Sequence, residues 1–327
     1  MGTIETREKK HYSFVPIVLR VLIVLSLSFF LAGCCPPVEE FSPPITYIPQ
    51  EKHIQKLACP FHPLTKEELC TEWGKELFVG LHFASELDLY RAITAFKRGK
   101  IFLPPSQKNR RNQFDYHLLQ CYYLAERYED ALQLFETTGL YTVETSFPAA
   151  KEMAVIVYDC YQKTGQCEKA EKIFALLQLL NPEAAANIQL GERFLAGDLD
   201  ALSNSSNERV QTFAADYCAN AKSIGKARLY NALLPGAGYL YVGQKQTALT
   251  SFCINVLFTT AAIYSFRNNN VPLGVILTSL EGGWYFGGIN GAGLAAQKYN
   301  EIYYASNGKE VMVCEKLFPI LNWETSF

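Results

Sequence analysis

The sequence lacks the excess of basic residues that nucleic-acid binding requires. Its 30 Lys and Arg against 32 Asp and Glu leave a net charge of −2 over 327 residues. No surface is therefore predicted to hold a phosphate backbone, and no nucleic-acid partner is expected. Charged residues make up only 19% of the chain and aromatic residues 13%, which excludes an acidic disordered protein. The length allows about two domains and a short extra segment.

Familiar catalytic motifs are also missing. No stretch matches a phosphate-binding loop, a nucleophile elbow or the two-histidine helix of zinc proteases. Residues 291–296 match the spacing of a dinucleotide-binding fingerprint, but no strand precedes them, so helix packing explains these glycines. We therefore predict that the protein is not an enzyme and binds no cofactor.

Four residues of metal-binding type, His53, Cys59, His62 and Cys70, lie close together before the middle of the chain. They are separated by 5, 2 and 7 residues, which fits no common zinc pattern. An exported protein forms disulfides, so a Cys59–Cys70 disulfide or free thiols are the alternatives. No metal site is predicted.

The N-terminal segment 1–34 has the order of an export signal. Basic residues, among them Lys9 and Lys10, precede the uncharged residues 21–32, and this apolar run is too short for a spanning helix. The box Leu31-Ala32-Gly33-Cys34 follows, and it resembles the signal of bacterial lipoproteins. The resemblance implies cleavage after residue 33 and attachment of palmitate to Cys34. An uncleaved signal anchor is the alternative.

Residues 73–202 contain an internal repeat. Ala92, Ala131 and Ala170 are equally spaced in the sequence, and a phenylalanine follows each of them by four positions. An aromatic residue also stands nine positions before each alanine. This pattern predicts three pairs of amphipathic helices, at 77–87 with 90–102, 114–125 with 128–137, and 152–163 with 167–180, and loops at 105–112 and 141–148. A degenerate fourth unit is predicted to begin near residue 190.

The repeat resembles the tetratricopeptide repeat, in which alanine lets paired helices approach and aromatic residues fill the gap between them. The 39-residue period departs from the usual 34. The resemblance implies a concave surface that holds a protein or peptide partner. Transferred by register, it places the partner-binding residues at Tyr116, Tyr123, Asp159, Gln162 and Lys163. Packing of Tyr116 and Tyr123 against neighbouring repeats is the alternative for these two residues, and a generic helical bundle is the alternative to the repeat.

A glycine-rich apolar segment follows the repeats. Residues 247–266 are uncharged and long enough to span a bilayer, a polar turn stands at 267–270, and 271–296 are again mostly apolar. These features predict a helical hairpin. Membrane insertion and burial in a soluble fold are the two alternatives, because Glu281 at mid-bilayer would cost about 2.5–3.5 kcal/mol.

Small residues in the second arm recur every four positions, which places them on one ridge of a helix. This predicted helix-packing row consists of Gly283, Gly287, Gly291 and Ala295. The facing row is predicted at Thr247, Ser251, Asn255 and Thr259. Upstream, residues 234–243 (LPGAGYLYVG) resemble the opening of the bacterial two-transmembrane-helix module, a family that implies membrane insertion and no established chemistry.

The sequence thus predicts an all-α protein of tetratricopeptide-like helical-hairpin repeats followed by a hydrophobic helical hairpin. The predicted segments are a signal peptide (1–33), a proline-rich tether (34–72), the repeats (73–202), a linker (203–225), the hairpin module (226–298) and a tail (299–327). The predicted function is a lipid-anchored scaffold that faces the periplasm in a bacterial envelope and binds protein partners and membrane lipid. A transport-like or catalytic role centred on Glu281 and a purely structural role are the alternatives.

Overall fold

The computed structural model describes residues 45, 51–142 and 146–327. The predicted signal peptide, Cys34 and most of the proline-rich tether lie outside the described residues. Within them, the predicted all-α class is confirmed, since every named element is a helix. The longer helices are α4 (Glu72–Ser85), α5 (Leu89–Phe102), α6 (Lys108–Leu124), α7 (Tyr128–Thr137), α8 (Ala150–Lys163), α9 (Cys167–Leu180), α10 (Pro182–Leu195), α12 (Glu208–Asn220), α13 (Ile224–Leu233), α15 (Lys245–Arg267) and α16 (Val271–Cys314). The shorter ones are α2 (Glu51–Ile54), α3 (Lys66–Cys70), α11 (Leu199–Ser203), α14 (Ala237–Val242) and the 3₁₀ turns η1 (Gly139–Thr142) and η2 (Pro319–Asn322).

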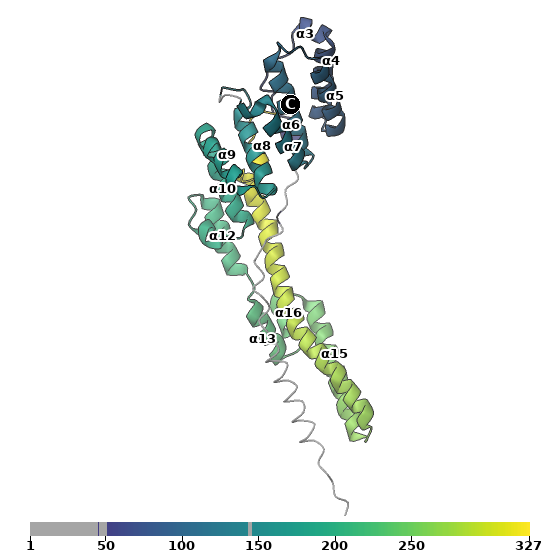
Figure 1. Ribbon diagram of the computed structural model, residues 1–327. Coiled ribbons are helices and arrows are strands. Elements are labelled where there is room, and N and C mark those ends of the chain that lie inside the picture. The colour runs from purple at the N-terminus through teal and green to yellow at the C-terminus, as the bar shows by residue number, and fades with distance from the viewer. Residues whose placement is uncertain (1–44, 46–50, 143–145) are drawn as a thin grey trace, which may run out of the picture. The chain divides into compact units, whose positions relative to one another are not determined.

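Helices α4 to α9 pack as three successive hairpins (Figure 1). Ala92, Ala131 and Ala170 are completely buried, as predicted for residues at the closest approach of paired helices. In the first hairpin, a Cβ added to Gly80 would lie 2.5 Å from the Phe96 ring. The ring thus fills the space that the missing side chain leaves, and the two helices interlock there.

The same turn joins the two helices of each hairpin. Leu87, Glu126 and Gly165, which have the same spacing as the buried alanines, have φ values of 60°, 58° and 72°. The amide of the next residue donates to the carbonyl of the repeated aromatic residue, Phe83, Tyr122 or Tyr161, at 2.9 Å. The internal repeat of the sequence therefore corresponds to a repeated backbone geometry.

Three predicted boundaries need correction. Helix α6 starts at Lys108, inside the loop predicted at 105–112. The predicted linker 203–225 contains α12, which buries Val210, Phe213 and Tyr217. The predicted tail is helical up to Cys314, because α16 continues without a break past residue 298.

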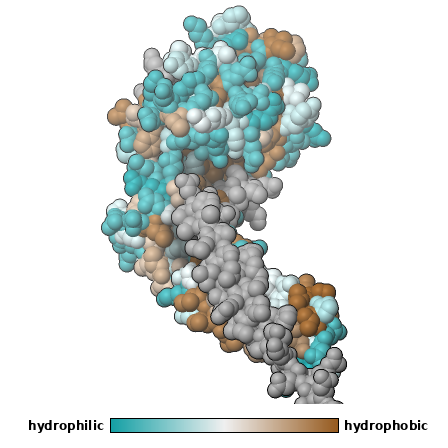
Figure 2. All heavy atoms as spheres, turned by 60° about the horizontal axis from the view of Figure 1, so that its bottom comes forward, coloured by the Kyte–Doolittle hydropathy of each residue, from teal (hydrophilic) through white to brown (hydrophobic). Residues whose placement is uncertain are grey.

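Helices α15 and α16 form the predicted apolar hairpin and lie side by side (Figure 1). Among the described residues, only α15 is long and apolar enough to cross a membrane; its mean hydropathy is 1.5 and 17% of its most apolar window is buried. Figure 2 shows patches of hydrophobic residues, in brown, among hydrophilic ones at the lower right, and mainly hydrophilic residues over the repeats at the top. Large apolar side chains such as Leu257 and Tyr264 are exposed on α15, which suggests association with a membrane.

Candidate functional site

The five residues predicted to bind a partner lie on the first helices of two hairpins. Tyr116 and Tyr123 belong to α6, and the other three to α8. The Tyr123 hydroxyl donates a hydrogen bond to Asp159 Oδ2 at 2.8 Å. The Lys163 ammonium lies 5.3 Å from the centre of the Tyr128 ring. The structure therefore brings Tyr123, Asp159 and Lys163 together.

These three side chains line one pocket with a volume of about 380 Å³. One wall comes from α6 and α8, a second from α10, and a third from Leu317 to Ile320, which follow α16. The acidic residues Glu126 and Glu192 also line it. The pocket combines an apolar wall with three carboxyl groups and one lysine, a composition suited to a partner side chain with an apolar stem and a positive end.

Burial raises the pKa of two carboxyl groups that line this pocket. It raises the pKa of the Asp159 carboxyl, although the nearby Lys163 and the bond from Tyr123 act in the opposite direction. Burial likewise raises the pKa of the Glu192 carboxyl, which accepts a hydrogen bond from the Tyr158 hydroxyl. A positive group of a partner would stabilise both carboxylates, because it would compensate for the hydration that they lost.

The other two predicted residues lie outside this pocket. Tyr116 is completely buried, with its ring 5.7 Å from Phe61 and 6.0 Å from Phe147. The prediction that Tyr116 offers an accessible contact is therefore wrong, because residues from both flanking segments cover it. Gln162 donates to the Tyr158 hydroxyl at 2.8 Å and lies at the exposed edge of the same face.

Sequence reasoning missed the wall formed by the C-terminal residues. Leu317, Phe318, Ile320, Leu321 and Trp323 are all buried. Five large apolar residues within seven positions are a burial signal that the sequence already contained. The sequence does not show which region these residues cover, because the residues that they contact lie more than a hundred positions earlier.

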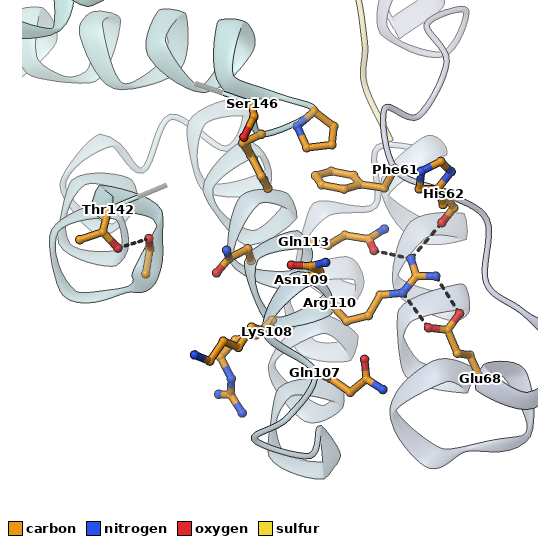
Figure 3. Close-up of a pocket in the computed structure, with 15 residues that line it drawn as sticks. Phe61, His62, Glu68, Gln107, Lys108, Asn109, Arg110, Gln113, Thr142 and Ser146 are labelled. Carbon is orange, nitrogen blue, oxygen red and sulfur yellow. Dashed lines mark hydrogen bonds and ion pairs between the residues drawn. The ribbon is translucent and has the colours of Figure 1, made fainter. Parts of the chain in front are cut away.

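A larger cavity of about 860 Å³ lies at the start of α6 (Figure 3). Its central cation, Arg110, makes a bidentate pair with Glu68 at 2.9 and 2.7 Å and also donates to the carbonyl of His62 at 2.9 Å. The guanidinium lowers the pKa of the Glu68 carboxyl. Figure 3 shows Arg110 turned toward Glu68 and Gln113. The arginine thus serves to fix residues 62–68 on α6.

The predicted helix-packing row divides into two parts. A Cβ at Gly283 or Gly287 would meet no atom within 4 Å, and both glycines line an open groove of about 830 Å³. Gly291, by contrast, lies against the Tyr239 hydroxyl, and Ala295 packs against the buried cluster of Ala227, Val242 and Ala296. The prediction that this row packs on α15 is thus not met at Gly283 and Gly287.

Two residues of the predicted facing row on α15 lie against α16, but not against the predicted glycines. Ser251 lies 3.8 Å from the position of a Cβ at Gly288, and Thr259 hydrogen-bonds Glu281. The α15-facing side of α16 is therefore rotated by one residue, about 100° on a helix, from the predicted row. Oxygen Oε2 of Glu281 is buried and has no hydrogen-bond partner among the described residues.

The described residues contain no cluster of three or more side chains able to hold a metal ion. Cys59 and Cys70 are free thiols. Comparison of the chain with protein-family models, curated proteins and solved structures finds no match. The resemblances to the tetratricopeptide repeat and to the two-transmembrane-helix module therefore stay predictions, and no function is transferred from a relative.

Proposed function

We propose that the protein is a lipid-anchored scaffold of the bacterial envelope that holds protein partners on its inner face. The inner face is the surface formed by α6, α8 and α10. The observation that carries the proposal is the 380 Å³ pocket on this face, which collects three of the five residues predicted to bind a partner. Tyr123 and Tyr128 provide rigid aromatic walls of the kind that is enriched at binding hot spots.

Site-specific photocrosslinking in the native cells tests this function. A crosslinking amino acid at Leu195, which lines the pocket, is expected to form protein adducts. Leu179 on α9 is 83% exposed and lies outside the pocket, so the same substitution there is the matched control. Glu126→Lys should reduce the adduct yield from Leu195, because it changes the charge of the pocket. Equal adduct patterns from both positions would contradict the proposal.

Membrane attachment is proposed to begin at Cys34, outside the described residues. Labelled palmitate should enter the wild-type protein, and Cys34→Ser should lose it. Because one acyl chain anchors only marginally while several hold firmly, a Cys34→Ser chain truncated near residue 205 should also leave the membrane fraction. Labelling that is equal in both proteins would remove the lipoprotein assignment.

A further inference from the structure

The inner face already carries an extended segment of the same chain. Residues 323–327, here called the tail segment, follow η2 and lie on α6 and α8. Figure 1 marks the C-terminal end beside α6. The amide of Ser326 donates to the carbonyl of Ala58 at 3.0 Å, and Thr325 forms a parallel bridge with Ala58. The tail segment is thus held in an extended, strand-like conformation.

Polar side chains of the inner face bind the backbone of the tail segment. Glu152 is 3% exposed, and its Oε1 accepts hydrogen bonds from the amides of Glu324 and Thr325 at 3.2 and 3.0 Å. Buried Gln120 donates to the Ser326 hydroxyl at 3.5 Å. A carboxylate that accepts two successive amides recognises an extended backbone whatever its side chains are.

Aromatic residues at the two ends of the tail segment occupy sockets on α6. The Trp323 ring lies 5.8 Å from the ring of Tyr123, and the Phe327 ring lies 5.9 Å from that of His117. The two anchors are four positions apart, and the small polar residues Thr325 and Ser326 lie between them. These contacts define a peptide pattern: two aromatic residues joined by a short polar stretch.

The fit is incomplete. Trp323 Nε1, Thr325 Oγ1 and Tyr116 Oη are buried without a hydrogen-bond partner in the part of the chain that the structure describes. Buried polar groups without partners destabilise the state that contains them. A segment that pairs Tyr116 Oη and leaves none of its own buried polar groups unpaired would therefore bind the same face better than the tail segment does.

We propose that the tail segment is an internal ligand of the inner face, and that a partner's extended segment with two aromatic residues four positions apart displaces it. This inference rests on the proposed scaffold function and adds its regulation. In the intact chain the tail segment occupies the part of the inner face formed by α6 and α8, and the partner replaces it by competition for Glu152 and the two aromatic sockets.

A labelled peptide with the sequence of residues 318–327 serves as the probe. The detergent-solubilised full chain should bind it weakly, whereas Trp323→Ala/Phe327→Ala should bind it at least tenfold more tightly. A peptide with both aromatic residues replaced by alanine is the control. Adding Glu152→Gln to the double variant should weaken binding at least fivefold. The proposal is overturned if the Trp323→Ala/Phe327→Ala variant has an unchanged circular dichroism spectrum and does not bind the peptide more tightly than the wild type.

A second variant does not depend on weakening the tail segment. Ala58→Cys/Thr325→Cys, with the other cysteines except Cys34 replaced, places thiols on bridge-paired residues, whose separation suits a disulfide. Oxidation should abolish peptide binding and reduction should restore it. If the oxidised protein forms the Leu195 adducts as well as the reduced one, the tail segment does not control the face and only this inference fails. If Trp323→Ala/Phe327→Ala binds the peptide but a crosslinker at Leu195 forms no protein adduct in cells, the scaffold function alone is refuted.

Discussion

At the scale of single residues, the small side chains of Ala131 and Ala170 allow the paired helices to pack closely. Both are completely buried, so Ala→Leu at either position would overpack the interface. The expected loss is about 1–3 kcal/mol in the free energy of unfolding. Denaturant unfolding followed by circular dichroism measures it, with Leu179→Ala on the exposed side of α9 as the control. Unchanged midpoints for both alanine variants would mean that the repeat alignment is wrong.

His117 makes the stability of the inner face depend on pH. Burial lowers the pKa of its imidazole to about 4, and its ring is surrounded by Phe61, Phe96 and Phe327. Between pH 6.5 and 4 the His117 imidazole is protonated in the unfolded chain and neutral in the folded chain. The free energy of unfolding is therefore unaffected by His117 above pH 6.5. As the pH drops from 6.5 toward 4, it decreases by up to about 3 kcal/mol.

His117→Gln should flatten this part of the pH profile while leaving other acid-sensitive groups in place. Unfolding midpoints at pH 7 and pH 4.5 measure the effect. Gln120, which lies 3.4 Å from His117 Nδ1, does not titrate, so it cannot produce the same slope. An equal decline in the wild type and the variant would show that another group is responsible.

At the scale of elements, the repeated hairpins could be predicted because their signals are local. The alanines, aromatic residues and turn positions recur with one common period, and each acts within one hairpin. Helix α12, which the linker prediction missed, also has local signals: Asn207 caps it by accepting from the amides of Arg209 and Val210, and its apolar residues have helical spacing. The Ser- and Asn-rich stretch before it concealed this pattern.

Long-range packing could not be predicted in the same way. Gln120 and Ser326 are 206 residues apart in sequence, and no periodicity connects them. The glycine row of α16 had the right spacing, but spacing does not determine which side of the helix meets α15. That choice depends on α13 and α14, which pack against the same helix.

The glycines of this module should respond in opposite directions to Gly→Ala. A Cβ at Gly238 would lie 2.7 Å from Ala292 Cβ and 2.8 Å from Asn231 Cβ, so Gly238→Ala should destabilise the fold by about 1–3 kcal/mol. Gly287 lies in the open groove, and alanine there should be neutral or stabilising by up to about 1 kcal/mol. Thermal unfolding in detergent compares the two. A larger loss from Gly287→Ala would show that the groove is filled in solution.

At the scale of the whole molecule, membrane insertion of the hairpin, one of the two alternatives left by the sequence, would fix its topology. If Cys34 is attached to the outer face of the inner membrane and both arms of the hairpin cross this membrane, the turn at Asn269 lies in the cytoplasm. Asn269→Cys, in a chain without other thiols except Cys34, should resist an impermeant maleimide in intact spheroplasts and react after lysis. Full labelling before lysis would exclude the span and leave a hairpin docked on the membrane surface.

The unbroken length of α16 would set a distance between the membrane and the inner face if the hairpin spans a bilayer. Its 44 residues correspond to about 66 Å at 1.5 Å per residue. If residues 271–296 are in the bilayer, residues 297–314 project about 27 Å beyond it. The helix then determines how far the inner face lies from the membrane. A partner anchored in the same membrane reaches the inner face only if its binding segment extends to that distance from the bilayer. Partners with short linkers would be excluded by reach alone, before any side chain is compared.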